Sequence, residues 1–580
     1  MNAVVGGFAQ NVETLSRFRA QAGLVGADLV VTPELSLMGY PPEDLLLKEG
    51  FIEAATQALN DLTKSENVPP ILVGTVVPEG ATGVTLAPSS DGRDTARVFD
   101  DDSRPRHVAN VLVALGDEGV VATAAKQLLP NYDVFDERRY FHPGLGPPTI
   151  INVRGVAVGL LVCEDVWLAN GPAAELARLG ATLLVVANAS PYARARRTER
   201  EAMLRERALE TNCPIAYVNL VGGQDELVFD GQSTVVDAQG HVVARARAFS
   251  EELLVVDVEA RDSTVGVALE THYARNESRG RAALTTHCEE VLDEVEEIYA
   301  ALVMGTRDYL RKNGFREAIV ALSGGVDSSL VAAIAVDAVG ARAVRGFAMP
   351  SRYSSEHSMS DAIELAQRLD IEIRTLPIEA PHEILSHELR DVLGGDPVGL
   401  TDENLQSRIR AVLMMAISNA TGAIVLTTGN KSEMAVGYST LYGDSAGGFA
   451  VIKDVPKTLV YELCRYRNDV ATRDGDPEPI PSAVLAKAPS AELRPDQRDD
   501  QSLPPYDLLD PLLELYVEQD ATAEEIIRLG YDRALVTRIT RLVDRSEYKR
   551  RQMPPGVRIS KKAFGRDRRM PITNSFRPEA

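Results

Sequence analysis

Short apolar runs rich in β-branched residues alternate with helical patterns through the first 260 residues. Such runs between polar segments are typical of buried strands, whereas apolar positions that repeat every three to four residues favour a helix. The pattern predicts a helix at 199–210 and a strand that leads into a hairpin at 233–240. It predicts further strands at 29–31, 71–74, 111–113, 156–162 and 183–187. Strands mixed with helices and hairpins indicate a layered α/β sandwich.

The second half shows a regular strand–helix order. We expect strands at 318–322, 343–349, 371–376 and 423–427, with helices at 330–339, 361–369 and 404–418. This order is typical of an open parallel sheet, whose ligand site lies at the carboxyl ends of the strands. Residues 1–260 and 291–580 are therefore expected to form two domains joined by a polar linker at 261–290. The segment at about 477–505 is rich in Pro, Asp and Arg, so we expect a mobile loop there.

Composition narrows the class of protein. A chain of 580 residues with a net charge of −23 is long enough for several domains. The negative charge disfavours nonspecific binding to nucleic acid or anionic membranes, because their phosphates would be repelled. The sequence shows neither a secretion signal nor an apolar stretch long enough to cross a membrane. Its four cysteines lack the spacing of disulfide frameworks or zinc sites, so we expect a cytoplasmic protein.

Basic residues gather near the C-terminus despite the overall negative charge. They are Lys549, Arg550, Arg551, Lys561, Lys562, Arg566, Arg568 and Arg569. A local basic patch on an acidic protein suits a small molecule that carries phosphate, and a solvated tail is the alternative.

The stretch 318–329 combines an apolar run with the sequence Ser-Gly-Gly-Val-Asp-Ser-Ser at 323–329. It predicts a strand, a tight glycine loop and a helix N-terminus, where backbone N–H groups and the helix dipole attract an anion. The Gly-Lys-Ser/Thr of a Walker A motif is missing, which disfavours γ-phosphoryl transfer. A turn without a ligand is the structural alternative. The seven residues resemble the pyrophosphate loop of the ATP pyrophosphatase superfamily, whose members cleave ATP between the α and β phosphates.

Three chemically useful residues end apolar runs in the first half: Glu34, Lys126 and Cys163. A thiolate nucleophile needs a base to take its proton and a cation to stabilise the oxyanion, and these residue types supply all three roles. Each also has a structural interpretation: the cysteine as a core residue, the glutamate as a helix cap, and the lysine as a side chain that extends to solvent. The combination favours catalysis.

The surroundings of these residues resemble the glutamine-hydrolysing branch of the nitrilase superfamily, above all at 126–141. The resemblance implies that Cys163 attacks the glutamine amide, that Glu34 is the general base and that Lys126 holds the oxyanion. Glu137 matches a second glutamate that orients such sites. Tyr132, Ser190 and Arg196 fall where that branch contacts glutamine. The chain departs from the family in one respect. The family opens with a β-strand before a segment like residues 2–6, and here residue 1 falls directly on that segment, so the first strand is expected to be missing.

Asp327 in the glycine loop is a carboxylate beside bound phosphates, so we expect it to hold Mg²⁺. Glu433 follows another strand in the sequence Thr-Gly-Asn-Lys-Ser-Glu at 428–433 and can complete the metal site. An exposed acid at a helix start is the alternative for Glu433.

Four segments of the second half, 404–410, 428–433, 448–458 and 489–493, resemble NAD synthetase. With the first half, nearly the whole chain resembles the family of glutamine-dependent NAD⁺ synthetases. The resemblance implies deamido-NAD⁺, ATP and L-glutamine as substrates, Mg²⁺ as cofactor and a homo-oligomer. It also implies a nitrilase-like α-β-β-α sandwich followed by a Rossmann-like parallel sheet with helices on both faces, as in the adenine nucleotide α hydrolases.

The same resemblance assigns binding residues in the second half. Asn404, Glu433 and Lys549 are expected to contact deamido-NAD⁺, with Arg550 and Arg551 as alternatives to Lys549. The residues expected at ATP are Leu322, Ser323, Gly324, Gly325, Val326, Asp327, Ser328, Ser329 and Thr428.

Two rival functions stay open at this point. Another glutamine-fed ATP pyrophosphatase, similar to GMP or asparagine synthetase, would use a different glutaminase domain, so the Glu34–Lys126–Cys163 arrangement speaks against it. A binding or regulatory protein without catalysis would not need an intact residue for every role.

Overall fold

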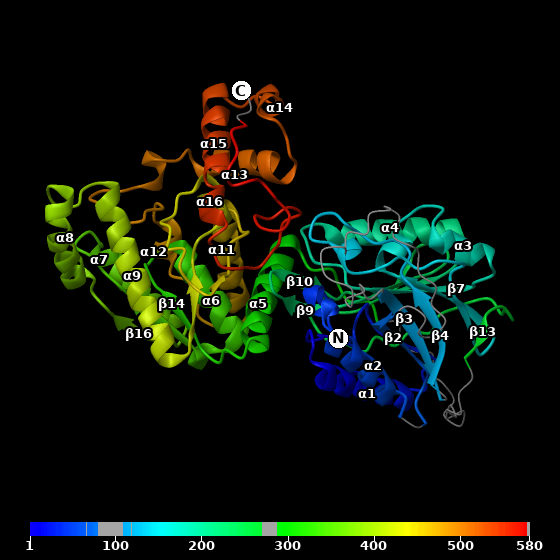
Figure 1. The fold of residues 1–580 in the computed structure, drawn as a ribbon. Helices are drawn as coiled ribbons and strands as arrows, with labels where there is room; N and C mark the ends of the chain where they lie inside the picture. Colours follow the sequence, from blue (N-terminus) through cyan, green and yellow to red (C-terminus); the bar gives the residue numbers. More distant parts are fainter. Residues whose placement is uncertain (65–66, 79–107, 118, 270–286, 577–580) are drawn as a thin grey trace, which may run out of the picture. The chain divides into compact units, whose positions relative to one another are not determined.

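The computed structural model describes residues 1–64, 67–78, 108–117, 119–269 and 287–576 (Figure 1). The chain divides into two compact units. Unit 1 comprises Met1–Gln224 and Val228–Leu292, and unit 2 comprises Asp225–Leu227 and Asp293–Ala580. Within the described residues, no helix has the length and apolar character needed to cross a membrane.

Unit 1 contains two sheets that face each other. The smaller has four strands in the order β1 (Val30–Val31), β2 (Ile71–Pro78), β3 (Val108–Gly116) and β4 (Gly119–Ala125). The larger has seven strands in the order β12 (Val242–Arg245), β11 (Thr234–Val236), β8 (Ile215–Asn219), β7 (Leu183–Asn188), β6 (Val156–Val162), β5 (Ile150–Val153) and β13 (Val267–Ala268). A separate hairpin joins β9 (Val221–Gln224) to β10 (Leu227–Asp230). The predicted strands of the first half are confirmed.

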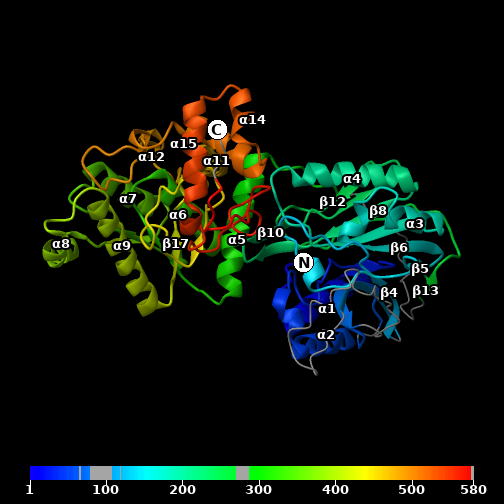
Figure 2. The ribbon, with the colours of Figure 1, turned by 45° about the horizontal axis from the view of Figure 1, so that its top comes forward.

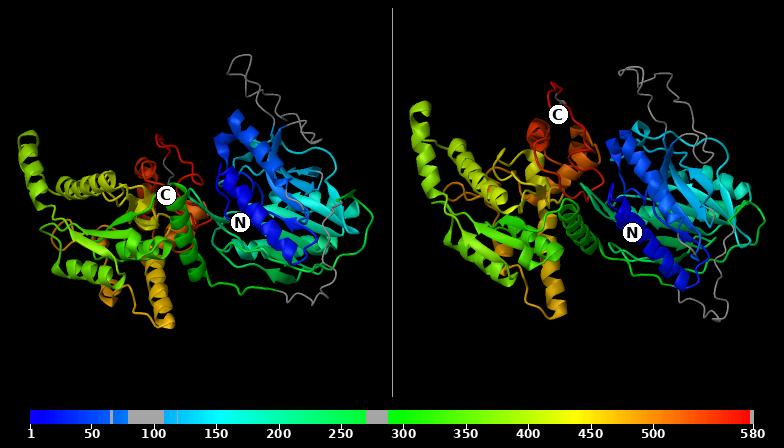
Figure 3. Two further views of the ribbon diagram at one scale, coloured as in Figure 1. Left: turned by 90° about the horizontal axis from the view of Figure 1, so that it is seen from below. Right: turned by 60° about the horizontal axis from the view of Figure 1, so that its bottom comes forward.

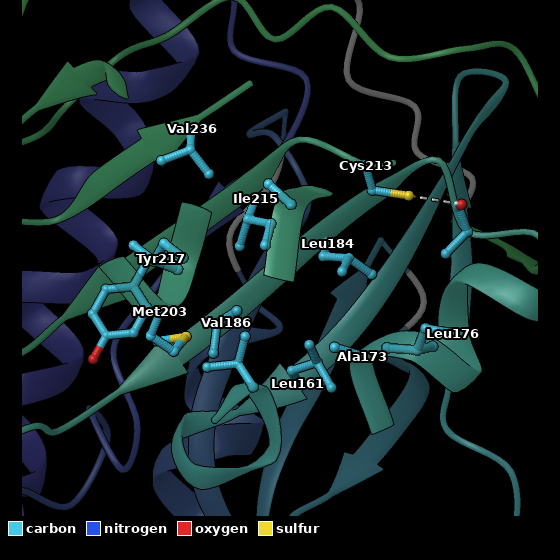
Figure 4. Close-up of a cluster of buried hydrophobic side chains, with 14 of the residues drawn as sticks. Leu161, Ala173, Leu176, Leu184, Val186, Met203, Cys213, Ile215, Tyr217 and Val236 are labelled. Carbon is cyan, nitrogen blue, oxygen red and sulfur yellow. Dashed lines mark hydrogen bonds between the residues drawn. The ribbon is translucent and has the colours of Figure 1, made fainter. Parts of the chain in front are cut away.

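Helices cover the outer faces of the two sheets (Figures 1 and 2). α1 (Phe8–Leu24) and α2 (Glu49–Leu62) lie beside the four-stranded sheet, and α3 (Pro172–Arg178) and α4 (Arg196–Thr211) beside the seven-stranded sheet. One apolar core fills the space between the sheets, and another, with Leu161, Leu184 and Tyr217, lies under α3 and α4 (Figure 4). The expected α-β-β-α sandwich is confirmed.

The structure adds detail to two expectations for unit 1, the linker at 261–290 and the missing first strand. Part of the segment expected as a linker, Val267–Ala268, pairs in parallel with β5 and forms the edge strand of the large sheet. Residues 270–286 of that segment lie outside the described residues. Residues 1–7 form no strand before α1 begins.

Unit 2 is built on a five-stranded parallel sheet with helices on both faces (Figure 3). The strand order is β16 (Glu372–Thr375), β15 (Val344–Ala348), β14 (Ala318–Ala321), β17 (Ile424–Thr427) and β18 (Phe449–Ala450). The helices of this part are α5 (Glu294–Lys312), α6 (Val326–Val339), α7 (Glu356–Arg368), α8 (Glu379–Leu393), α9 (Leu400–Thr421), α10 (Lys431–Val436) and α11 (Lys457–Asp474). Order and direction match the prediction of an open parallel sheet.

A helical cluster follows the sheet along the chain. It contains α12 (Ser482–Ala486), α13 (Tyr506–Leu513), a π-helical turn (Glu514–Glu518), α14 (Ala523–Arg528), α15 (Arg533–Arg545) and α16 (Glu547–Arg550). The cluster has its own apolar core, which includes Ala435 and Val436 of α10. The segment 477–505 contains α12 and a short 3₁₀ turn, Asp499–Gln501.

Candidate active sites

Glu34 and Lys126 enter the interior of unit 1 just beyond β1 and β4, the two edge strands of the four-stranded sheet. Glu34 lies three residues beyond β1, and Lys126 directly follows β4. The chain at Glu34 passes so close to β2 that a Cβ on Gly74 would lie 2.3 Å from the carbonyl oxygen of Pro33. A residue without a side chain is therefore required at position 74, since no real Cβ tolerates such a contact.

The two side chains form a buried ion cluster with Glu137. Lys126 Nζ lies 2.7 Å from Glu34 Oε1 and 2.8 Å from Glu137, and all three side chains are at most 4% exposed. Asn110 donates to Glu34 Oε1 at 2.7 Å, and the Ala189 N–H donates to Oε2 at 3.0 Å. These hydrogen bonds fix the orientation of the Glu34 carboxylate, because both of its oxygens are engaged.

Tyr40 anchors the other carboxylate. Its hydroxyl donates to Glu137 at 3.0 Å. The pKa of Glu137 is raised to about 7. Burial is the largest cause, the Lys126 ammonium opposes it, and the Glu34 charge adds to it. Burial alone would lower the pKa of Lys126, but Glu137 and Glu34 raise it well above its ordinary value. The ammonium is therefore charged at neutral pH, as an oxyanion-binding group requires.

Cys163 sits on a sharp turn at the end of β6. It begins a 3₁₀ turn, Cys163–Val166, and its backbone has φ of 44°, a left-handed conformation that is uncommon for a residue with a side chain. Burial raises the pKa of the thiol well above its ordinary value, and Glu34 raises it further while Lys126 opposes this effect. The resting sulfur is a protonated thiol, so its attack on a substrate needs a base. Glu34 is a carboxylate close enough to act on that thiol electrostatically.

The three residues expected at glutamine lie on different elements of unit 1. Tyr132 is 47% exposed, and its hydroxyl donates to Glu164, the residue after Cys163, at 3.0 Å. Arg196 begins α4, lies 3.2 Å from Glu199 and packs over the ring of Trp167. Burial and Glu164 raise the pKa of Tyr132, and Arg196 opposes them, so these groups lie within electrostatic range of one another.

Ser190 follows β7 and is buried. Its N–H donates to the side-chain oxygen of Asn219 at 2.9 Å. Ser190 is next to Ala189, whose N–H holds Glu34, so it lies one residue from the ion cluster.

In unit 2 the glycine loop joins β14 to α6, as the sequence predicts. Gly324 has φ of 73°, and a Cβ there would lie 2.2 Å from the carbonyl oxygen of Ser358 in α7. The Ser328 and Ser329 hydroxyls donate to the carbonyl of Gly325, at 3.0 and 2.9 Å. The loop is thus held tightly in front of the N-terminus of α6, a position that suits an anion.

Not every residue expected at ATP offers its side chain. Leu322, Val326, Ser328 and Ser329 are buried in unit 2, whereas Ser323 is exposed and Asp327 is partly exposed. Thr428 directly follows β17, whose carboxyl end lies next to that of β14 in the sheet.

Asp327 and Glu433 come together through a lysine. Lys457, the first residue of α11, pairs with Asp327 and lies 3.3 Å from Glu433. Asn430 donates to Asp327 at 3.0 Å. Burial raises the pKa of Glu433 to about 8, with Lys457 lowering it and Asp327 raising it. Burial lowers the pKa of Lys457, but Asp327 and Glu433 outweigh burial and raise it.

The two carboxylates have the oxygen chemistry that Mg²⁺ prefers. In the part of the chain that the structure describes, no group of three or more His, Cys, Asp or Glu side chains is arranged to hold a metal by itself. In the described structure both carboxylates are paired with the Lys457 ammonium.

The residues expected at deamido-NAD⁺ converge on one segment, 433–444. Glu433 belongs to it, and Asn404 of α9 accepts a hydrogen bond from Thr440 at 2.9 Å. Lys549 of α16 donates to the carbonyls of Gly437 and Ser439 at 2.7 and 2.8 Å. Burial lowers the pKa of Lys549. Each of the three residues thus lies in the 433–444 segment or is hydrogen-bonded to it.

Several of the C-terminal basic residues make structural contacts. Arg550 is buried and donates to the carbonyl of Ala435 at 2.6 Å, and Arg551 lies 2.8 Å from Glu547. Lys562 pairs with Asp520. Both Lys549 and Arg550 therefore contact the 433–444 segment, but Arg550 is buried, whereas Lys549 is only partly buried.

Sequence reasoning missed several residues of both sites. Asn110 could have been noticed as an amide inside an apolar strand, and Lys457 as a cation at a helix start, where it opposes the dipole. Tyr40 and Glu164 carry no comparable signal.

A buried cysteine–carboxylate–lysine site on a sandwich, followed by a phosphate-binding loop on a parallel sheet, defines a hydrolase joined to a nucleotide-using enzyme. The family profile for carbon-nitrogen hydrolase matches residues 1–264, and that for NAD synthase matches residues 298–554.

Full-length relatives agree with this division. The glutamine-dependent NAD(+) synthetase of Xylella fastidiosa is 44% identical over 99% of this chain and 97% of its own, and that of Aquifex aeolicus is 42% identical over 94% of each. The solved glutamine-dependent NAD⁺ synthetase from Acinetobacter baumannii, in complex with ADP, is 36% identical with a TM-score of 0.72, covering 100% of this chain and 98% of its own. The chain belongs to the family of glutamine-dependent NAD(+) synthetases.

Proposed function

We propose that the chain converts deamido-NAD⁺, ATP, L-glutamine and water to NAD⁺, AMP, diphosphate and L-glutamate. It is a ligase that forms a C–N bond with glutamine as the amide donor. The observation that supports this reaction best is that one chain contains residues for both half-reactions. These are the buried Glu34–Lys126–Cys163 cluster and the glycine loop with Asp327. Residues 1–260 are assigned to glutamine hydrolysis and residues 291–580 to synthesis.

Glutamine hydrolysis begins with the neutral thiol. Glu34 takes the proton as the Cys163 sulfur attacks the side-chain amide, and Lys126 stabilises the oxyanion. Glu34 then gives the proton to the departing ammonia, and a thioester remains. Water attacks the thioester with Glu34 as base, and glutamate leaves. Glu137, held by Tyr40, keeps Lys126 charged and in place.

Glutamine is a zwitterion with an amide side chain, so its site needs charged groups outside the buried cluster. Arg196 suits the α-carboxylate, Tyr132 offers an exposed ring and hydroxyl, and Ser190 stands beside the backbone that holds Glu34. The link from Tyr132 to Glu164 supports this arrangement, because it ties the outer residues to the turn that carries Cys163.

Synthesis needs an activated carboxyl group. The nicotinate carboxylate of deamido-NAD⁺ attacks the α-phosphorus of ATP, and diphosphate leaves onto the glycine loop and the N-terminus of α6. Ammonia then attacks the acyl-adenylate, and AMP leaves. Lys457 supplies positive charge beside Asp327 where the phosphates are expected.

Magnesium is proposed as the metal that accompanies ATP. Asp327 and Glu433 would hold it, and it would neutralise charge on the phosphates. Asn404, Glu433 and Lys549 are proposed to contact deamido-NAD⁺, which the shared 433–444 segment supports.

A homo-oligomer is proposed as the working form. Helices α8 and α9 expose large apolar side chains, among them Val392, Leu400 and Val412, and such surfaces favour association. Sedimentation should show an assembly that Val412→Asp weakens; an unchanged monomer in both cases would contradict the idea. A cytoplasmic location stays a prediction.

The function is tested by following NAD⁺ formation from deamido-NAD⁺ and ATP with either glutamine or ammonium. Both donors should support synthesis by the full chain. Cys163→Ala should abolish glutamine-dependent synthesis and leave ammonium-dependent synthesis intact. Loss of both in a folded variant would refute the division of labour, and no synthesis by the wild type with either donor would refute the reaction.

A further inference from the structure

Asp165 is a buried carboxylate that the mechanism above does not use. It is 3% exposed and occupies the third position of the 3₁₀ turn that begins with Cys163. An ionised carboxylate in an apolar interior is costly unless hydrogen bonds compensate, so its contacts indicate its purpose.

Its oxygens accept hydrogen bonds from the backbone on both sides of the glutamine-hydrolysing site. Oδ1 accepts from the N–H groups of Gln127 and Leu128, at 3.0 and 2.8 Å. Oδ2 accepts from the N–H of Val162 at 3.3 Å. Gln127 and Leu128 directly follow Lys126, and Val162 directly precedes Cys163. One carboxylate therefore joins the segment that carries the lysine to the turn that carries the thiol.

The stronger pair of these hydrogen bonds is not a local cap. The donors at Gln127 and Leu128 lie 38 and 37 positions away along the chain, whereas a cap would bond only within its own turn. The Lys126 side chain is itself fixed at its far end by Glu34 and Glu137. The Asp165 carboxylate thus supplies the anchor at the backbone end of the same lysine.

We propose that Asp165 is a positioning residue for glutamine hydrolysis, whose carboxylate sets the Lys126 segment against the Cys163 turn. The inference rests on the proposed function. It assigns Asp165 no contact with glutamine. A lysine displaced by about 1 Å from the oxyanion costs on the order of 100-fold in rate.

Replacement by asparagine isolates the carboxylate from the shape of the side chain. The amide of Asp165→Asn has a single acceptor oxygen, and its NH₂ group would face a backbone donor. The amide therefore cannot hold the Lys126 segment and the Cys163 turn together. A matched control exists at Asp237, whose carboxylate accepts from the N–H groups of Gln239 and His241 at 2.9 and 2.8 Å within one hairpin. Asp237→Asn makes the same chemical change in unit 1 without joining two parts of the site.

The experiment compares wild type, D165N and D237N as full-length chains. Active sites are counted by labelling to completion with an electrophilic glutamine analogue, and glutamine hydrolysis is measured per labelled site. D165N should lower kcat by 10- to 100-fold with less than a threefold change in KM for glutamine, while D237N matches the wild type. Ammonium-dependent NAD⁺ synthesis should be equal in all three.

Each outcome decides the matter. A wild-type kcat per labelled site in D165N, with fewer sites labelled, would show a purely structural role and overturn the proposal, as would an equal loss in D237N. If D165N does not fold, Asp165→Glu takes its place, because it keeps the charge but shifts the oxygens by one methylene; an unchanged kcat there would overturn the proposal. A wild type without glutamine-dependent synthesis would instead refute the proposed function.

Discussion

The two candidate sites of this chain each place a lysine between two carboxylates, but they differ in how deeply these side chains are buried. In unit 1, Lys126 sits between two carboxylates whose side chains are 0% and 4% exposed. In unit 2, Lys457 also sits between two carboxylates, but Asp327 and Glu433 are 18% and 19% exposed. In the proposed reaction the first cluster acts on one small amide, so it can be assembled in advance. In the same proposal the second admits two large anionic substrates, which agrees with charges that remain within reach of solvent.

The glycines follow the same division. Gly74 lets the Glu34 segment pass against β2, and it serves the packing of a finished site. Gly324 lets the loop before α6 pass close to the backbone of Ser358. In unit 1 the close backbone contact positions the Glu34 side chain, and in unit 2 it positions the loop that is proposed to bind phosphate.

The largest effect is expected at Asp327. Asp327→Asn removes a carboxylate from the open site, so NAD⁺ synthesis with either ammonium or glutamine should fall by about 10³-fold. Glutamine hydrolysis should continue, because the buried cluster is untouched. Asp370→Asn, at an exposed turn with φ of 54°, is the control and should leave every activity unchanged. Retained synthesis by D327N at ordinary Mg²⁺ would overturn the role of Asp327.

Glu137 offers the corresponding test of the buried site. Glu137→Gln keeps the shape and removes a charge beside Lys126, so kcat for glutamine hydrolysis should fall by about 100-fold. Synthesis from ammonium should not change. Glu53→Gln on the exposed face of α2 is the control. A loss of ammonium-dependent synthesis in E137Q would mean that the comparison between independent sites is wrong.

Substitutions of two glycines at opposite ends of α6 distinguish an effect on substrate binding from an effect of backbone strain. A Cβ on Gly324 would meet Ser358, whereas Gly340, with φ of 85°, has open space around it. Gly324→Ala should raise KM for ATP by about tenfold, because the loop must move. Gly340→Ala should lower the free energy of unfolding by about 1 to 3 kcal/mol and leave KM unchanged, because φ of 85° with ψ of 149° is a conformation that essentially only glycine adopts. Equal KM values in both variants would argue against a phosphate role for the loop.

The smallest effect concerns pH. Burial raises the pKa of Asp165 from 3.8 to about 7. Between these values the folded chain binds a proton that the unfolded chain releases, so this group's contribution to stability falls as pH rises through that window. Asp165→Asn has no such proton. The melting temperature of D165N minus that of the wild type should therefore increase by a few degrees from pH 4.5 to pH 7.5.

Fluorescence makes this measurement local, since Trp167 is the single tryptophan of the chain and lies in unit 1. D237N should follow the wild type. Parallel pH curves for D165N and wild type would show that the carboxylate titrates as in the unfolded chain.

The strands, the parallel sheet and the strand-end residues Glu34, Lys126 and Cys163 were predictable because burial and periodicity are local properties of the sequence. Their partners were not. Asn110, Tyr40 and Lys457 reach the sites from segments that only the folded chain brings near, and polarity alone does not say which distant groups will meet.

The edge strand at Val267–Ala268 escaped prediction for a related reason. Both of its residues are exposed, so it lacks the apolar alternation that marks a strand. Its place is set by pairing with β5, a property of the partner rather than of its own sequence.

The protonated state of Cys163 has a consequence for chemical damage. Peroxide and simple electrophiles react with thiolates far faster than with thiols. Because burial and neighbouring carboxylates raise the pKa of the Cys163 thiol, we expect it to resist oxidation while no substrate is bound. A covalent inhibitor of this site should gain its selectivity from a glutamine-like backbone that docks before the warhead reacts, rather than from the reactivity of the warhead.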